Sequence, residues 1–137
     1  MKRNKVILLT ITVILIIITG IYVIKNSNRQ KASETSYKTI TQETAMKMMS
    51  EEKNYIIIDV RTKEEFEGGH IPNAISLPVD RIGDGDIPEL PDKNQLIMVY
   101  CRSGNRSRQA AEKLAKKGYT NVVDFGGITT WTGKIVK

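Results

Sequence analysis

The chain has 137 residues and a formal net charge of +6, with one cysteine and one histidine. Four of its 21 cationic residues precede residue 26, so the remainder carries 17 cationic against 15 acidic side chains, which excludes the broad basic surface of a nucleic-acid-binding domain. A lone cysteine excludes an intrachain disulfide, and one cysteine with one histidine is too few for a zinc site, so we expect neither a metal ion nor a cofactor.

The first segment of the chain is an uncharged run at 6–24, rich in Ile, Leu and Val. As a helix it would span roughly 28 Å, close to the ~30 Å hydrocarbon core of a bilayer. We therefore expect residues 1–24 to be a transmembrane anchor, with a cleaved signal peptide and a secreted protein as the alternative. Cations near the N-terminus favour a cytoplasmic head and an extracytoplasmic domain. A polar linker is expected at 25–36, followed by one domain at 37–137.

The domain is predicted to open with a strand at 37–40 and a helix capped by Thr41. The nearly continuous apolar run at 55–60 is typical of a strand buried on both faces of a parallel sheet. Directly after it, Thr62 and Glu65 have the spacing of a capping box, in which each side chain bonds the other's backbone amide. A short helix is expected to begin there.

The later segments continue the alternation of strand and helix. Ser107 is predicted to cap the last long helix and Gly118 to end it. This alternation predicts an α/β fold with a central, mostly parallel sheet flanked by helices on both faces. The expected elements are strands at 74–78, 96–100 and 121–125, and a helix at 107–117.

Cys101 follows a predicted strand and precedes a predicted helix. In open α/β sheets, ligands bind beyond the carboxyl ends of strands. The partial positive charge of a helix N-terminus and the neighbouring arginines lower the pKa of a thiol, and the thiolate is the nucleophilic form. We therefore predict that Cys101 is a catalytic nucleophile.

The residues after Cys101 permit tight turning, so their amides are expected to converge on an anion held above the sulfur. Arg102 and Arg106 would attract that anion. The predicted substrate-binding residues are those of the loop: Arg102, Ser103, Gly104, Asn105, Arg106 and Ser107.

This loop resembles the active-site loop of the rhodanese-like sulfurtransferases. Two further segments carry the resemblance, which covers residues 37–131, nearly the whole expected domain. They are Asp59-Val60-Arg61 with Glu65-Phe66 and Gly69-His70-Ile71-Pro72-Asn73-Ala74-Ile75 before Leu77-Pro78, and Gly126-Gly127-Ile128 with Trp131.

The resemblance implies a rhodanese-like fold and a ping-pong sulfur transfer. Cys101 would take the outer sulfur of a small anionic donor such as thiosulfate and pass it from a persulfide to cyanide, a thiol or a protein acceptor. The loop amides would stabilise the persulfide. His70, Asp59, Arg61 and Trp131 are expected to have structural roles.

Two other functions stay open. Cysteine-dependent phosphatases and arsenate reductases also hold a thiolate in an anion-binding loop, but the phosphatase pattern is His-Cys, five residues, then Arg. Here Tyr100 precedes the cysteine and four residues separate Cys101 from Arg106. A tighter loop suits a single sulfur atom better than a tetrahedral oxyanion. The third possibility is a non-catalytic module that carries sulfur or binds a partner.

Overall fold

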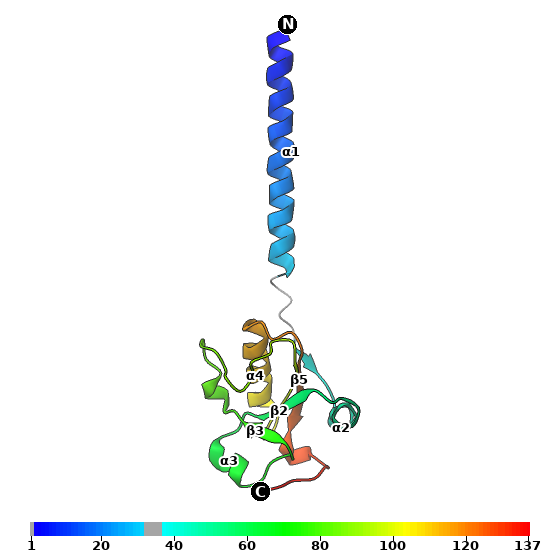
Figure 1. Cartoon of the computed structure of the whole chain (residues 1–137), viewed down its shortest axis with the longest axis vertical. Helices are drawn as coiled ribbons and strands as arrows, with labels where there is room; N and C mark the ends of the chain where they lie inside the picture. Colours follow the sequence, from blue (N-terminus) through cyan, green and yellow to red (C-terminus); the bar gives the residue numbers. More distant parts are fainter. Residues whose placement is uncertain (1, 32–36) are drawn as a thin grey trace. The chain divides into compact units, whose positions relative to one another are not determined.

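The computed structural model describes residues 2–31 and 37–137, and the chain divides into two compact units, Met1–Glu34 and Thr35–Lys137 (Figure 1). The first unit is a single helix, α1, at Lys2–Lys31. It continues beyond residue 24 into the segment expected to be a linker. The rest of that linker, 32–36, lies outside the described residues.

The transmembrane prediction concerns α1. Among the residues whose side chains the structure describes, no helix is long and apolar enough to cross a membrane. The membrane anchor and the extracytoplasmic location stay predictions.

The second unit is built on a five-stranded sheet with the strand order β1-β5-β4-β2-β3. Every neighbouring pair runs parallel, as the alternation of strands and helices predicts. The middle position belongs to β4, and the two edges belong to β1 and β3. The strands are β1 Lys38–Thr39, β2 Tyr55–Asp59, β3 Ala74–Ser76, β4 Leu96–Cys101 and β5 Val122–Gly127.

The helices begin where short polar side chains or a glycine can cap them. Thr41 accepts a hydrogen bond from the Thr44 amide at the start of α2, and Thr62 and Glu65 form both bonds of the predicted capping box at the start of α3. The helices are α2 Gln42–Glu51, α3 Lys63–Glu67 and α4 Asn105–Lys116, with short 3₁₀ turns η1 Val79–Arg81 and η2 Ile128–Thr130.

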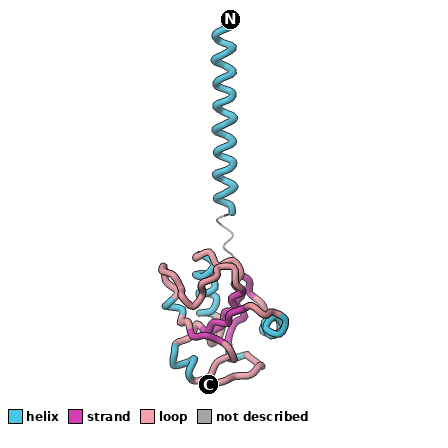
Figure 2. The backbone as a smooth tube through the Cα atoms, viewed as in Figure 1, coloured by secondary structure: helices cyan, strands magenta, loops and turns pink. Residues whose placement is uncertain are grey.

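Alternation of side chains along the buried strands produces two hydrophobic cores, one on each face of the sheet. One core packs under α4 and contains Val99 and Cys101; the other packs under α2 and α3 and contains Met98 and Tyr100. Figure 2 shows the strands in the interior of this unit with helices and loops around them. The prediction of helices on both faces is confirmed, and consecutive residues Tyr100 and Cys101 point to opposite layers.

Candidate active site

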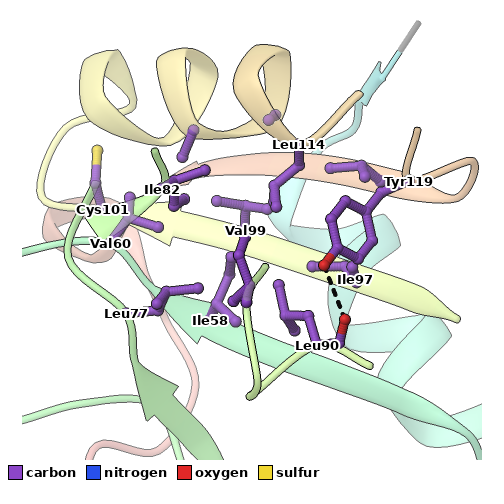
Figure 3. Close-up of a cluster of buried hydrophobic side chains, with 14 residues drawn as sticks. Ile58, Val60, Leu77, Ile82, Leu90, Ile97, Val99, Cys101, Leu114 and Tyr119 are labelled. Carbon is purple, nitrogen blue, oxygen red and sulfur yellow. Dashed lines mark hydrogen bonds between the residues drawn. The ribbon is translucent and has the colours of Figure 1, made fainter. Parts of the chain in front are cut away.

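Cys101 is the last residue of β4, at the carboxyl edge of the sheet, as the sequence predicts. Its side chain is only 1% exposed and lies at the end of the α4-side core (Figure 3). The pairing of β4 with β5 shifts register between Val99 and Cys101. Such an irregularity re-aims a side chain at a strand end, and here it falls at the reactive residue.

The loop after Cys101 turns tightly because Gly104 adopts φ 101°, a conformation that favours glycine. This turn brings the Gly104 amide to 3.0 Å from the Cys101 sulfur, to which it donates a hydrogen bond. Gly104 is also the N-cap of α4, which begins at Asn105. The prediction that Ser107 caps the helix is wrong, because the curl around the sulfur starts the helix earlier.

Ser107 lies instead within the first turn of α4, fully buried. Its hydroxyl oxygen is 3.6 Å from the Cys101 sulfur and accepts a hydrogen bond from the thiol. The same hydroxyl donates toward the carbonyl oxygens of Gly104 at 3.1 Å and Gly126 at 3.3 Å. Ser107 is therefore a direct neighbour of the sulfur, as the loop prediction requires, although its role is not that of a cap.

The surroundings of Cys101 favour its thiolate. Burial raises the pKa of the Cys101 thiol, but hydrogen bonding with the Ser107 side chain and with the amides of Ser107, Gly104 and Ser103 outweighs it, so the pKa lies below its ordinary value. The loop amides thus converge on the sulfur itself, while their binding of an anion above it stays a prediction. At 3.0 Å from the sulfur, the Gly104 amide is close enough to stabilise the negative charge of the Cys101 thiolate by a hydrogen bond.

The back of the loop is fastened to the segment that follows β5. The Arg102 carbonyl accepts two hydrogen bonds from Thr129, one from its amide at 3.2 Å and one from its hydroxyl at 3.0 Å. Gly127 lies so close beneath that an added Cβ would overlap the Arg102 carbonyl and approach the Ser103 Cα to 2.6 Å. Gln42 in turn donates to the Gly127 carbonyl at 2.6 Å.

Gln42 and Thr129 thus support the site, and the sequence analysis did not identify them. Gln42 opens α2 and Thr129 lies in η2, far from Cys101 in sequence. Each donates a hydrogen bond from its side chain to a backbone carbonyl, Gln42 to that of Gly127 and Thr129 to that of Arg102. Other side chains with a hydrogen-bond donor could make such contacts, so no motif marks these positions. The neighbouring Gly126-Gly127 pair was the available signal.

The two arginines expected to attract an anion differ in the structure. Arg102 is exposed, and its guanidinium has no acceptor within the described part of the chain. Arg106 donates two hydrogen bonds to the Glu65 carboxylate, at 2.7 and 2.9 Å. Glu65 belongs to α3, so this ion pair joins the helix after β2 to the loop after β4. Arg102 is thus the unpaired one of the two, and anion binding by either arginine stays a prediction.

The residues expected to be structural make internal contacts. Asp59 and Arg61 form a buried ion pair at 2.6 Å, and Arg61 also donates to the Gly69 carbonyl at 2.7 Å. His70 bonds the Phe66 carbonyl through Nδ1 at 3.0 Å and stacks on the Phe66 ring. These contacts agree with the structural roles predicted for them.

Other sites are limited within the described ranges. No group of three or more His, Cys, Asp or Glu side chains could hold a metal ion there. A polar cavity of about 320 Å³ lies where β2 and β4 begin, at the opposite edge of the sheet from Cys101. It is lined by Met48, Glu52, Asn54, Asp92, Asn94, Gln95, Leu96 and Asn121.

Comparison with known proteins identifies the family. The rhodanese-like domain family matches residues 41–134, which include the Cys101 loop and both supporting segments. The chain belongs to this family. A solved structure described as a rhodanese with anions from E. coli is 36% identical, with a TM-score of 0.56, over 61% of this chain and 98% of that one. The predicted rhodanese-like fold is confirmed.

Several curated relatives of this rhodanese-like chain are named as sulfurtransferases. It is 39% identical over 71 residues to the thiosulfate sulfurtransferase PspE of Escherichia coli, covering 52% of this chain and 68% of the relative. It is 36% identical over 93 residues to a sulfurtransferase of Allochromatium vinosum, covering 67% and 85%. These relatives support a sulfurtransferase at the level of the family.

Some relatives are much longer than this chain. The adenylyltransferase and sulfurtransferase uba4 of Ogataea parapolymorpha is 36% identical over 92 residues, which cover 66% of this chain but 23% of that protein. The rhodanese-like domain therefore also occurs within larger proteins.

Proposed function

We propose that this rhodanese-like protein moves a sulfane sulfur from a small anionic donor such as thiosulfate to a thiol, cyanide or protein acceptor through a persulfide on Cys101. The observation that carries the proposal is the Gly104 amide 3.0 Å from the Cys101 sulfur, next to the Ser107 hydroxyl. Together these groups lower the pKa of the thiol, which supplies the thiolate nucleophile.

The first half of the reaction charges the cysteine. The Cys101 thiolate attacks the outer sulfur of thiosulfate, a new S–S bond forms, and the bond between that sulfur and the sulfonate group breaks. Sulfite leaves with the electron pair, and the negative charge moves to the outer sulfur of the persulfide. The amides at the start of α4 are already oriented, so they stabilise this charge without reorganisation.

The second half of the reaction transfers the sulfur from Cys101 to the acceptor. A thiolate or cyanide attacks the outer sulfur of the persulfide, the S–S bond to Cys101 breaks, and Cys101 returns as a thiolate. The sequence has no second cysteine, so the acceptor must come from outside this chain. Whether a small thiol or a protein takes the sulfur changes the acceptor and leaves the chemistry at Cys101 unchanged.

Two observations favour sulfur over phosphate as the transferred group. Four residues separate Cys101 from Arg106, which leaves a smaller loop than a tetrahedral oxyanion needs. Arg106, whose counterpart in the phosphatase pattern would bind the oxyanion, is bonded to Glu65 through both terminal nitrogens. A phosphate would have to displace that carboxylate.

Mass spectrometry of the intact protein tests the proposal. The full chain is incubated with thiosulfate, freed of excess donor and weighed beside a Cys101→Ser variant treated in the same way. We expect the wild type alone to gain the mass of one sulfur atom and to lose it on addition of cyanide or a thiol. An unmodified wild type that instead hydrolyses an aryl phosphate would replace sulfur transfer with the phosphatase reading.

A further inference from the structure

Glu65 occupies the junction between α3 and the Cys101 loop. One carboxylate oxygen accepts from the Thr62 amide at 3.0 Å and from Arg106 at 2.7 Å, and the other accepts from Arg106 at 2.9 Å. The capping box fixes the carboxylate from the α3 side, because the Thr62 amide donates to it while the Glu65 amide donates to the Thr62 hydroxyl. The paired Arg106 guanidinium is thereby held on the side of the loop that faces α3.

This pair controls the charge beside the reactive sulfur. The Glu65 and Arg106 side chains are 27% and 32% exposed, so solvent screens their charges only in part. Arg106 directly precedes Ser107, whose hydroxyl oxygen lies 3.6 Å from the Cys101 sulfur, so its charge belongs to the surroundings of the site. Hydrogen bonds to Glu65 raise the pKa of Arg106, and the charge of the Cys101 thiolate also raises it. Glu65 therefore offsets the positive charge of Arg106 close to the Cys101 loop.

We propose that Glu65 is a positioning residue that sets the charge preference for the sulfur donor by neutralising Arg106. The inference rests on the proposed sulfur transfer at Cys101. With the carboxylate present, Arg102 is the unpaired cation of the loop within the described residues, so the positive charge that favours a doubly charged donor is smaller than it would be with Arg106 unpaired as well. Without it, Arg106 would attract a dianion more strongly than a monoanion, since Coulomb energy is proportional to ligand charge.

Glu65→Gln separates charge from shape. Glutamine also completes a capping box, so α3 keeps its N-terminal bonds, while one of the two hydrogen bonds from Arg106 and the negative charge are lost. The reverse change is Arg106→Gln, which leaves the Glu65 charge unpaired. The two substitutions shift the local charge in opposite directions.

The experiment measures the second-order rate constant for persulfide formation on the full chain with two donors. Thiosulfate is a dianion that leaves sulfite, and benzenethiosulfonate is a monoanion that leaves benzenesulfinate; each transfers its terminal sulfur to the Cys101 thiolate. For Glu65→Gln we expect a rise of about fivefold with thiosulfate and about twofold with benzenethiosulfonate. For Arg106→Gln we expect both rate constants to fall, thiosulfate more steeply.

The ratio of the two rate constants decides the outcome, because any change in the fraction of thiolate affects both donors equally. Thr62→Ala is the matched control: it removes the hydroxyl that accepts from the Glu65 amide but leaves the ion pair, and its ratio should equal that of the wild type. A ratio unchanged or lowered by Glu65→Gln overturns the proposal. If that variant does not fold, Arg106→Gln decides alone, and a ratio that does not fall overturns it.

The proposed function fails in a different way. If the wild type forms no persulfide with either donor, sulfur transfer itself is refuted and no ratio exists. If the wild type reacts and the ratio does not respond to either variant, sulfur transfer stands and the role of Glu65 is refuted. Raising the ionic strength gives a second readout, because the gain in Glu65→Gln is electrostatic and should diminish as salt screens it.

Discussion

The sulfur of Cys101 and the hydroxyl oxygen of Ser107 lie 3.6 Å apart, and the hydroxyl can bond in two directions. While Cys101 is a thiol, Ser107 accepts from the sulfur and donates to the carbonyls of Gly104 and Gly126. When Cys101 is a thiolate, the same hydroxyl can donate to the sulfur instead. Ionisation of the cysteine is therefore coupled to rotation of a single O–H bond.

Replacing Ser107 by alanine should raise the pKa of Cys101, because the hydroxyl stabilises the thiolate. At neutral pH we expect persulfide formation about tenfold slower than in the wild type, the size of one hydrogen bond to a charged group. The rate should recover as pH rises through the higher pKa. Rate against pH checks this, with Ser50→Ala on the exposed face of α2 as control. An unshifted profile would mean that Ser107 only fills space.

The Glu65–Arg106 pair should make stability depend on acid. The hydrogen bonds that Glu65 accepts from Arg106 lower the pKa of Glu65 from 4.5 to about 2. A carboxyl with a depressed folded-state pKa stabilises the protein above pH 4.5 and loses that contribution as pH falls toward 2. After allowing for solvent screening, we expect the wild type to lose about 1 kcal/mol more than Glu65→Gln between these limits.

Urea unfolding at a series of pH values measures that loss. Glu112→Gln is a suitable control, since Glu112 pairs with Lys116 at 2.7 Å on the exposed face of α4. Equal acid sensitivity of Glu65→Gln and the wild type would show that the pair contributes no stability.

Gly127→Ala should disturb the loop without changing any polar group. The added methyl would overlap the Arg102 carbonyl and crowd the Ser103 Cα, so the loop must move away from η2. We expect a loss of about 2 kcal/mol in stability and at least a tenfold loss of persulfide formation. Thermal unfolding and the rate check this. Gly83→Ala, which adds a methyl in open space, should change neither. A fully active Gly127→Ala would mean that the loop tolerates displacement.

Removing Asp59 should destabilise the domain strongly. Asp59 is fully buried and Arg61 nearly so, and the alanine variant would leave the guanidinium without its carboxylate. We expect a loss of about 3 to 5 kcal/mol in the free energy of unfolding. Lys116→Ala breaks an exposed pair within α4 and should change the stability far less. Similar values for the two variants would contradict the view that burial makes the Asp59–Arg61 pair critical.

The sequence predicted the fold well because its signals are local. The apolar runs of β2 and β4 and the capping box of Thr62 and Glu65 each lie within a few residues, and all are present in the structure. The position of Cys101 at a strand end follows from the same pattern. A parallel sheet then requires the carboxyl ends to share one edge.

The misinterpreted features depend on contacts distant in sequence or on backbone shape. Serine is a favoured N-cap residue, but here Gly104, with its positive φ, occupies the N-cap. The helix α4 therefore begins earlier, and Ser107 is buried in its first turn. Arg106 looked free because its partner, Glu65, belongs to a helix on another part of the sheet. No spacing rule relates residues so far apart.

Burial of the Cys101 sulfur also limits which oxidants it can meet. Each sulfur of a disulfide is bonded to two atoms, whereas the outer sulfur of thiosulfate is bonded to one. A thiolate that is 1% exposed is more easily reached by the second kind. The recess should therefore protect the resting cysteine from forming mixed disulfides, while it still admits a donor whose outer sulfur is bonded to a single atom.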